Sequence, residues 1–281
     1  MQPSLILAIC ALLLMGAADA VSRRARQAGV AVSMYMLMQC PFFLITAVAA
    51  SALLTGFDLS WAAWGYASLS ALLAFSATML LLKSLRRGEA SVNVVVFRMG
   101  FVFSTMAALL VFDEPARPAK CVGLLLAACA IGVLAHGIPR NHGGARASLT
   151  DAVAAMALAA FMQFVWAWAT KSGVRPTSFL FAQSVAYLVL AGLYAWLVER
   201  SRLSREVLLY APINGVLTAC GTLAALAAMV KGEVSVTLPI AQMSFVVTAL
   251  LSIAFLREKM TMSKAVGGLL AVGAVILLGL R

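Results

Sequence analysis

The feature that most restricts how this chain can fold is an internal repeat at a constant offset of 144 residues. The segment Gly-Glu-Ala-Ser-Val at 88–92 returns as Gly-Glu-Val-Ser-Val at 232–236. Aligned without a gap, residues 87–137 and 231–281 share 16 identities in 51 positions. The identities include charged residues, which a shared apolar composition would not produce: Glu114/Glu258 and Lys120/Lys264. The chain is therefore predicted to be a tandem repeat of one structural unit.

The composition predicts an integral membrane protein. The chain is 63% apolar and 11% charged, whereas a soluble domain is about half apolar and a quarter charged. Its net charge of +11 could indicate nucleic acid binding. However, the basic residues lie in short clusters between apolar runs, which is typical of membrane loops. We therefore expect membrane lipids as partners and no nucleic acid.

The apolar runs predict ten membrane-spanning helices, since a hydrocarbon core about 30 Å thick needs about 20 apolar residues. The expected spans are 4–22, 31–55, 61–83, 91–112, 117–136, 149–170, 177–198, 207–230, 235–256 and 263–280. The predicted fold is all-α, with a first repeat at 1–137, a linker at 138–147 and a second repeat at 148–281. Because each repeat holds an odd number of spans, the two repeats must be inverted in the membrane.

Loop charges predict the orientation. Loops after the odd-numbered spans hold fourteen Lys and Arg residues, whereas the other face holds six. The positive-inside rule therefore places the odd-numbered loops in the cytoplasm and both termini outside. We expect a multi-pass protein of a bacterial-type inner (plasma) membrane. Small residues along spans 5 and 10 suit helix contacts or a dimer seam, so the expected state is a monomer or a weak homodimer.

Arg98 and Gln242 are repeat partners that place a polar group inside spans 4 and 9. A central Arg costs about 2.5–3.5 kcal/mol on insertion scales, so it needs a reason to be there. Arg98 could face a cavity and hold a carboxylate or phosphate, or it could pair structurally with Asp19 or with helix carbonyls. A solute site near the pseudo-twofold axis would be lined by both Arg98 and Gln242.

Five further residues are candidates for the site. Asp19 in span 1 is a possible proton carrier or a structural partner of Arg23. Gln163 and Trp166 share one face of span 6, where Trp166 could instead belong to an interfacial aromatic belt. Asn214 lies on a polar face of span 8, which small residues could equally use for helix packing. Asn93 could contact solute or bond to the start of its helix.

Pro239 and the pattern of polar residues favour transport. Pro239 interrupts the hydrogen-bond ladder of span 9, and a broken helix at mid-membrane is tolerated where it lines a cavity. Two inverted halves around a central site are typical of secondary transporters, which expose that site to each side in turn. A lipid flippase or scramblase is the alternative; it would need a polar groove that opens between helices.

The sequence resembles the drug/metabolite transporter superfamily, and specifically its ten-span members with two EamA domains. The matching features are the Gly-Glu-x-Ser-Val segments, the Pro239-Ile240-Ala241 run, and Glu114 and Glu258. The resemblance covers the whole chain and implies an exporter of amino acids, drugs or other metabolites. In the family's Pro-Ile-x-Arg pattern the first repeat here keeps Arg98 without the proline, and the second keeps Pro239 without the arginine.

No enzymatic activity, metal or cofactor is expected. The two histidines, His136 and His142, lie near the junction of the repeats. The sequence contains no Gly-x-Ser-x-Gly or His-Glu-x-x-His motif and no Gly-rich ATP-binding loop, so it lacks the patterns of serine hydrolases, zinc proteases and nucleotide-driven pumps.

Overall fold

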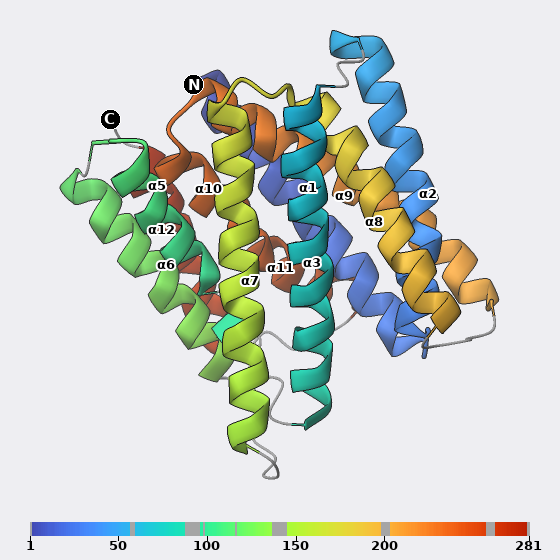
Figure 1. The fold of residues 1–281 in the computed structure, drawn as a ribbon. Coiled ribbons are helices and arrows are strands. Elements are labelled where there is room, and N and C mark those ends of the chain that lie inside the picture. Colours follow the sequence, from blue (N-terminus) through green and yellow to red (C-terminus); the bar gives the residue numbers. More distant parts are fainter. Residues whose placement is uncertain are drawn as a thin grey trace.

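The computed structural model describes residues 2–56, 60–87, 96–97, 99–115, 117–136, 145–197, 203–256 and 262–279. Within these ranges the chain forms helices joined by short connections and contains no strand. The elements are α1 (Pro3–Gln27), α2 (Val32–Ala50), the π-helical turn η1 (Ser51–Thr55), α3 (Trp61–Arg87), α5 (Gly100–Val111), α6 (Pro118–His136), α7 (Ala145–Lys171), α8 (Pro176–Leu197), α9 (Arg205–Lys231), α10 (Val234–Gln242), α11 (Ser244–Leu256) and α12 (Met262–Gly279). The beginning of α1 and the end of α12 lie at the same end of the bundle (Figure 1).

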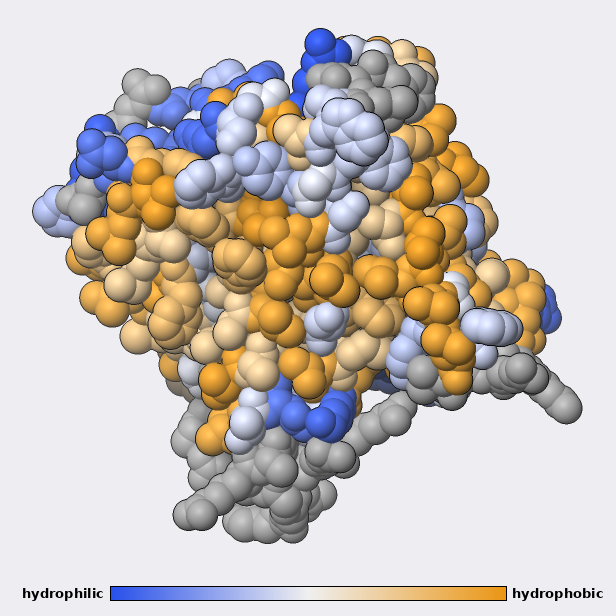
Figure 2. Space-filling view, in the orientation of Figure 1, coloured by the Kyte–Doolittle hydropathy of each residue, from blue (hydrophilic) through white to orange (hydrophobic). Residues whose placement is uncertain are grey.

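The outer surface of the bundle is apolar. Figure 2 shows a broad band of hydrophobic side chains across the visible face, with hydrophilic residues at its upper edge. Large apolar side chains such as Leu110 and Leu269 are 82% and 74% exposed, which water would disfavour but lipid would not. In the described part of the chain, six helices are long and apolar enough to cross a membrane, and four apolar helices are shorter.

Helix contacts come in pairs that the 144-residue offset exchanges. The contact of α1 with α9 corresponds to that of α7 with α3, and α2 with α9 corresponds to α8 with α3. Contacts between α6 and α12, and between α2 and α8, are their own counterparts. The small residues of spans 5 and 10 lie in the α6–α12 contact, where a Cβ on Gly123 would stand 2.8 Å from the Leu278 side chain. The predicted repeat is thus also a repeat of packing.

Span 9 is interrupted at Met243, four residues after Pro239. The α10 helix ends at Gln242, Met243 forms a turn, and α11 begins at Ser244. Pro239 has no backbone N–H, so it cannot close the helical hydrogen bond to the carbonyl four residues earlier. That missing bond lies within α10, on the N-terminal side of Pro239, whereas the break at Met243 leaves α10 as a helix of 9 residues. The equivalent Met99 of span 4 also forms a turn, although Val95 stands in place of the proline, so the interruption does not depend on Pro239.

The N-terminus of α10 is capped by a carboxylate from the other repeat. Asp113 adopts a left-handed conformation with φ of 50°, which turns the chain after α5 toward α10. The Glu114 carboxylate then accepts the backbone N–H groups of Val234 at 2.7 Å and Ser235 at 2.8 Å. These N–H groups belong to the first turn of α10, where no helical acceptor exists, and the helix dipole favours a negative charge there.

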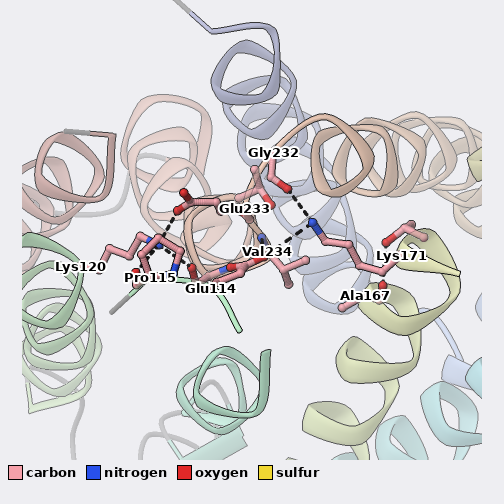
Figure 3. A network of polar contacts seen from close by, with 11 residues as sticks. Glu114, Pro115, Lys120, Ala167, Lys171, Gly232, Glu233 and Val234 are labelled. Atoms are coloured by element: carbon pink, nitrogen blue, oxygen red, sulfur yellow. Dashed lines mark hydrogen bonds and ion pairs between the residues drawn. The ribbon is translucent and has the colours of Figure 1, made fainter. Parts of the chain in front are cut away.

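Two lysines complete this network (Figure 3). Lys120 is 2% exposed, and its Nζ donates to the Pro115 carbonyl at 2.8 Å and to Ser235 Oγ at 3.1 Å, and forms an ion pair with Glu233. Lys171 Nζ lies 3.7 Å from Glu114 Oε1 and donates to the Gly232 carbonyl at 3.2 Å. Five residues of this network are identical at the equivalent positions of the other repeat: Glu114, Lys120, Gly232, Glu233 and Ser235. The identities that reveal the repeat in the sequence therefore include the residues of this structural contact. The equivalent Glu89, Ser91 and Glu258 lie outside the described residues, as does the side chain of Lys264.

Replacing Glu114 by Gln should destabilise the protein markedly. The side chain is 6% exposed, so the variant leaves Lys171 without its ion partner and turns an amide N–H toward a helix N-terminus. We expect a loss of about 3 kcal/mol, typical of breaking a buried ion pair, measured by thermal unfolding in detergent. The control is Lys83→Gln, which breaks an ion pair with Asp151 in which the lysine is 47% exposed; such pairs contribute about 0–1 kcal/mol. Equal melting of the two variants would contradict the assigned role of Glu114.

Candidate functional site

A cavity of about 280 Å³ lies inside the bundle. Its described wall comes from α1, α2, α3, α7, α8, α9, α10 and α11, so both repeats build it. The lining residues are Met15, Ala18, Asp19, Gln39, Cys40, Phe43, Ala74, Met162, Trp166, Gln183, Ser184, Tyr187, Thr218, Thr222, Gln242 and Ser244. The interruption after α10 places Gln242 and Ser244 on this wall, one on each side of the break.

Equivalent positions of the two repeats face each other across the cavity. The offset of 144 relates Gln39 to Gln183, Cys40 to Ser184 and Phe43 to Tyr187, and it also relates Ala18 to Met162 and Ala74 to Thr218. A cavity lined by both members of each pair lies on the axis that relates the repeats.

The wall combines apolar surface with a few polar groups. Phe43, Trp166 and Tyr187 contribute aromatic rings, while Gln39, Gln183 and Gln242 contribute amides. Asp19 is the only carboxylate among the described lining residues. Sites for small organic molecules typically have such a mostly apolar wall with a few polar groups that orient the ligand.

A polar cluster lies at one end of the cavity, near the connection between α1 and α2. Asn214 is 4% exposed, and its Nδ2 lies 2.7 Å from Ser22 Oγ, 2.6 Å from Tyr35 Oη and 3.3 Å from Gln39 Oε1. Thr218 Oγ1 donates to Asn214 Oδ1 at 2.8 Å. Helices α1, α2 and α9 are therefore joined by hydrogen bonds directly beside the cavity.

The repeat-related cluster joins α3, α7 and α8. The connection between α7 and α8 lies at the opposite end of the bundle from the connection between α1 and α2 (Figure 1). Ser70, the repeat partner of Asn214, accepts hydrogen bonds from Trp166 Nε1 at 2.8 Å and from Gln183 Nε2 at 2.9 Å. Trp166 and Gln183 are in turn the partners of Ser22 and Gln39. The same three positions thus form a polar cluster at each end of the cavity, with Gln at one position in both repeats and different side chains at the other two.

Only some of the predicted site residues lie on the cavity wall. Gln242, Trp166 and Asp19 lie on the cavity wall. Gln163 is buried on α7, where its Oε1 accepts a hydrogen bond from Ser104 Oγ at 2.8 Å. Asn214 lies in the polar cluster that joins α1, α2 and α9. Arg98 and Asn93 lie outside the described residues.

Sequence reasoning passed over several residues of the cavity wall and of the clusters beside it. Phe43 and Tyr187 are aromatic at equivalent positions of spans 2 and 7, so the offset could have identified them. Ser70 and Tyr35 are common residue types in membrane helices, and nothing in the sequence marks them as partners of Gln183 and Asn214. Only the packing of the helices brings these pairs together.

Comparisons with known proteins agree with the repeat. A model of the EamA-like transporter family matches residues 2–135 and again residues 149–280. An uncharacterized protein of Methanocaldococcus jannaschii is 34% identical over 76 residues, which are 27% of this chain and 56% of that protein. The chain therefore spans about half the length of the curated relative that it matches. One crystal structure of a protein superposes with a TM-score of 0.81 at 18% identity, covering 98% of this chain and 96% of the other; this likeness shows the fold alone.

Replacing Asn214 by Leu should lower stability by about 2 kcal/mol, because Tyr35 and Thr218 lose a buried hydrogen-bond partner. Thermal unfolding in detergent measures the change. Ile213→Leu is the matched control, since the neighbouring side chain is 47% exposed and makes none of these bonds. An Asn214→Leu variant as stable as Ile213→Leu would show that the cluster does not hold α9 to α1 and α2.

Proposed function

Because the chain belongs to the EamA-like transporter family, we propose that it is a secondary transporter of small polar or amphipathic organic metabolites such as amino acids. The observation that carries the proposal is the cavity of about 280 Å³ lined from equivalent positions of both repeats. Its volume is near the lower end of the usual range for small-molecule sites, about 300 Å³. Aromatic rings beside amides and a carboxylate suit a solute with an apolar body and a polar group. By resemblance to the family, the direction is export.

The proposed mechanism is alternating access between two inverted five-span repeats. The short apolar helices would complete ten crossings together with the six longer ones. The Asn214 and Ser70 clusters support this mechanism, because each joins helices at one end of the cavity through a few hydrogen bonds. If one cluster separates while the other stays closed, the cavity opens to one side at a time.

Solute contact is proposed for the polar groups nearest the axis. Gln242 and Trp166 lie on the cavity wall, and Arg98 is the repeat partner of Gln242. Arg98 would hold the carboxylate of a solute, with Asn93 nearby in the same span. Gln163 and Asn214 would support the wall from behind, since their polar atoms contact Ser104, Tyr35 and Thr218.

Asp19 is the proposed proton site, because it places a carboxylate on the cavity wall that solute and proton could reach in turn. The protein would lie in a bacterial-type inner membrane with the basic odd-numbered loops in the cytoplasm. It would act as a monomer or a weak homodimer, without nucleic acid or cofactor.

Transport by purified protein in liposomes tests the proposal. We expect uptake of some members of a panel of labelled amino acids, organic acids and organic cations. Changing Arg98 to Gln and Gln242 to Leu together should lower the rate about tenfold or more, since a solute then loses at least one buried polar partner. An imposed pH gradient should accelerate wild-type uptake, and Asp19→Asn should remove that acceleration.

Two results would contradict the proposal. A double variant that folds and transports at the wild-type rate would remove the axis site. Translocation of fluorescent lipids with no uptake of any solute in the panel would assign the protein to the flippases instead.

A further inference from the structure

The amide of Gln183 is only half satisfied. Gln183 lies on α8, is 6% exposed and lines the cavity. Its Nε2 donates to Ser70 Oγ at 2.9 Å. Its Oε1 is buried and has no hydrogen-bond partner among the described residues. A buried acceptor without a partner is unfavourable, so its presence on a cavity wall calls for a donor from outside the chain.

The repeat explains why this acceptor lacks a partner. Gln39, the equivalent residue, also lines the cavity, and its Oε1 accepts a hydrogen bond from Asn214 Nδ2 at 3.3 Å. The position of Asn214 is taken in the first repeat by Ser70, which has no amide to donate. The Ser70 hydroxyl accepts from Gln183 Nε2 and from Trp166 Nε1 at 2.8 Å, so it contacts the amide nitrogen of Gln183 and not Oε1. The glutamine oxygen therefore has a donor at Gln39, whereas the equivalent oxygen of Gln183 has none among the described residues.

The surroundings of Gln183 favour a positively charged donor. Tyr187 lies one helical turn further along α8, and the Trp166 indole and the Gln183 amide share Ser70 as a hydrogen-bond partner. Tyr187, Trp166 and Gln183 all line the cavity, whereas Ser70 does not. Aromatic faces attract cations. Asp19 adds a carboxylate to the same wall. An amine brings both the N–H that Oε1 lacks and the charge that these groups attract.

We propose that Gln183 Oε1 accepts a hydrogen bond from an amine N–H of the solute, which makes Gln183 the residue that selects amine-bearing solutes. This inference rests on the proposed function, because it takes the cavity as the solute site. It goes further by naming the chemical group that is recognised and the atom that recognises it. Gln39, although equivalent by the repeat, is assigned no such role.

Binding of two cations that share one apolar body tests the inference. 2-Phenylethylamine carries an ammonium group with N–H donors, whereas its N,N,N-trimethyl derivative has the same charge and no N–H. Affinities for both are measured by calorimetry on the full chain in detergent. The variant Gln183→Met keeps a side chain of similar length and removes the acceptor. Gln39→Met is the matched control at the equivalent position.

Gln183→Met should weaken binding of the primary amine about tenfold, the usual consequence of losing one buried hydrogen bond to a charged group, and should leave the trimethyl compound within about twofold. Gln39→Met should change the two affinities by the same factor, and Gln183→Glu, which keeps an acceptor oxygen, should retain the preference for the primary amine.

Three outcomes would overturn the inference. In the first, Gln183→Met changes both affinities equally or changes neither. In the second, Gln39→Met alters the preference as strongly as Gln183→Met does. In the third, the wild-type protein binds neither cation, which excludes amine recognition. Uptake of other solutes in liposomes would leave the proposed transport function intact in all three cases.

Discussion

The contact on which the cavity depends is the one between the Glu114 carboxylate and the N-terminus of α10. A helix cannot satisfy its own first N–H groups, and Val234 and Ser235 at the start of this 9-residue helix are both buried. Glu114 supplies both oxygens, and Lys171 is the ion partner of its carboxylate. Lys120 pairs with Glu233, the residue just before α10. With its beginning fixed in this way, α10 ends at a defined depth, and the break at Met243 places Gln242 and Ser244 on the cavity wall.

The repeat places the site between the two halves, and the differences between the repeats determine the orientation in which a solute can bind. Gln39 and Gln183, or Phe43 and Tyr187, occupy equivalent positions and line one cavity. Yet Asn214 is replaced by Ser70 in the other half, and Pro239 by Val95. Identical halves would offer a solute the same contacts in two orientations. Unequal halves can hold the solute in one orientation. A polar group that has a hydrogen-bond partner within one repeat can lack that partner in the other repeat and remain free to bind solute.

Much of the architecture could be predicted because it follows from hydropathy and self-similarity. Most helices of the described chain begin and end within a few residues of the predicted spans, because a backbone in lipid must satisfy its own hydrogen bonds. The span predicted at 91–112 is described only in part, by α5 from Gly100. Gln242, Trp166 and Asp19 could be found as polar or amphipathic groups inside apolar runs. The inverted arrangement in the membrane and the roles of these residues stay predictions.

The partners of the polar groups could not be predicted, because they depend on which helix faces meet. Gln163 shares a helix face with Trp166, but it contacts Ser104 on α5 while Trp166 contacts Ser70 on α3. Span composition also gave no reason to rank Gln183 above Gln39. The two glutamines differ in their hydrogen-bond partners, which are Asn214 for Gln39 and Ser70 for Gln183. The identical charged pairs of the repeat were visible in the sequence, but their role as a helix cap was not.

The central claim is that solute binds in the cavity between the repeats, and protection of a single cysteine tests it most directly. Ala74 lines the cavity on α3, whereas Leu72 on the same helix is 50% exposed on the outer surface. Each is changed to Cys in a chain whose five native cysteines are replaced by serine or alanine, and the rate of alkylation is measured with and without a transported solute. The account predicts that the solute slows alkylation at position 74 and has no effect at position 72. Equal rates at position 74 with and without a saturating solute would contradict it.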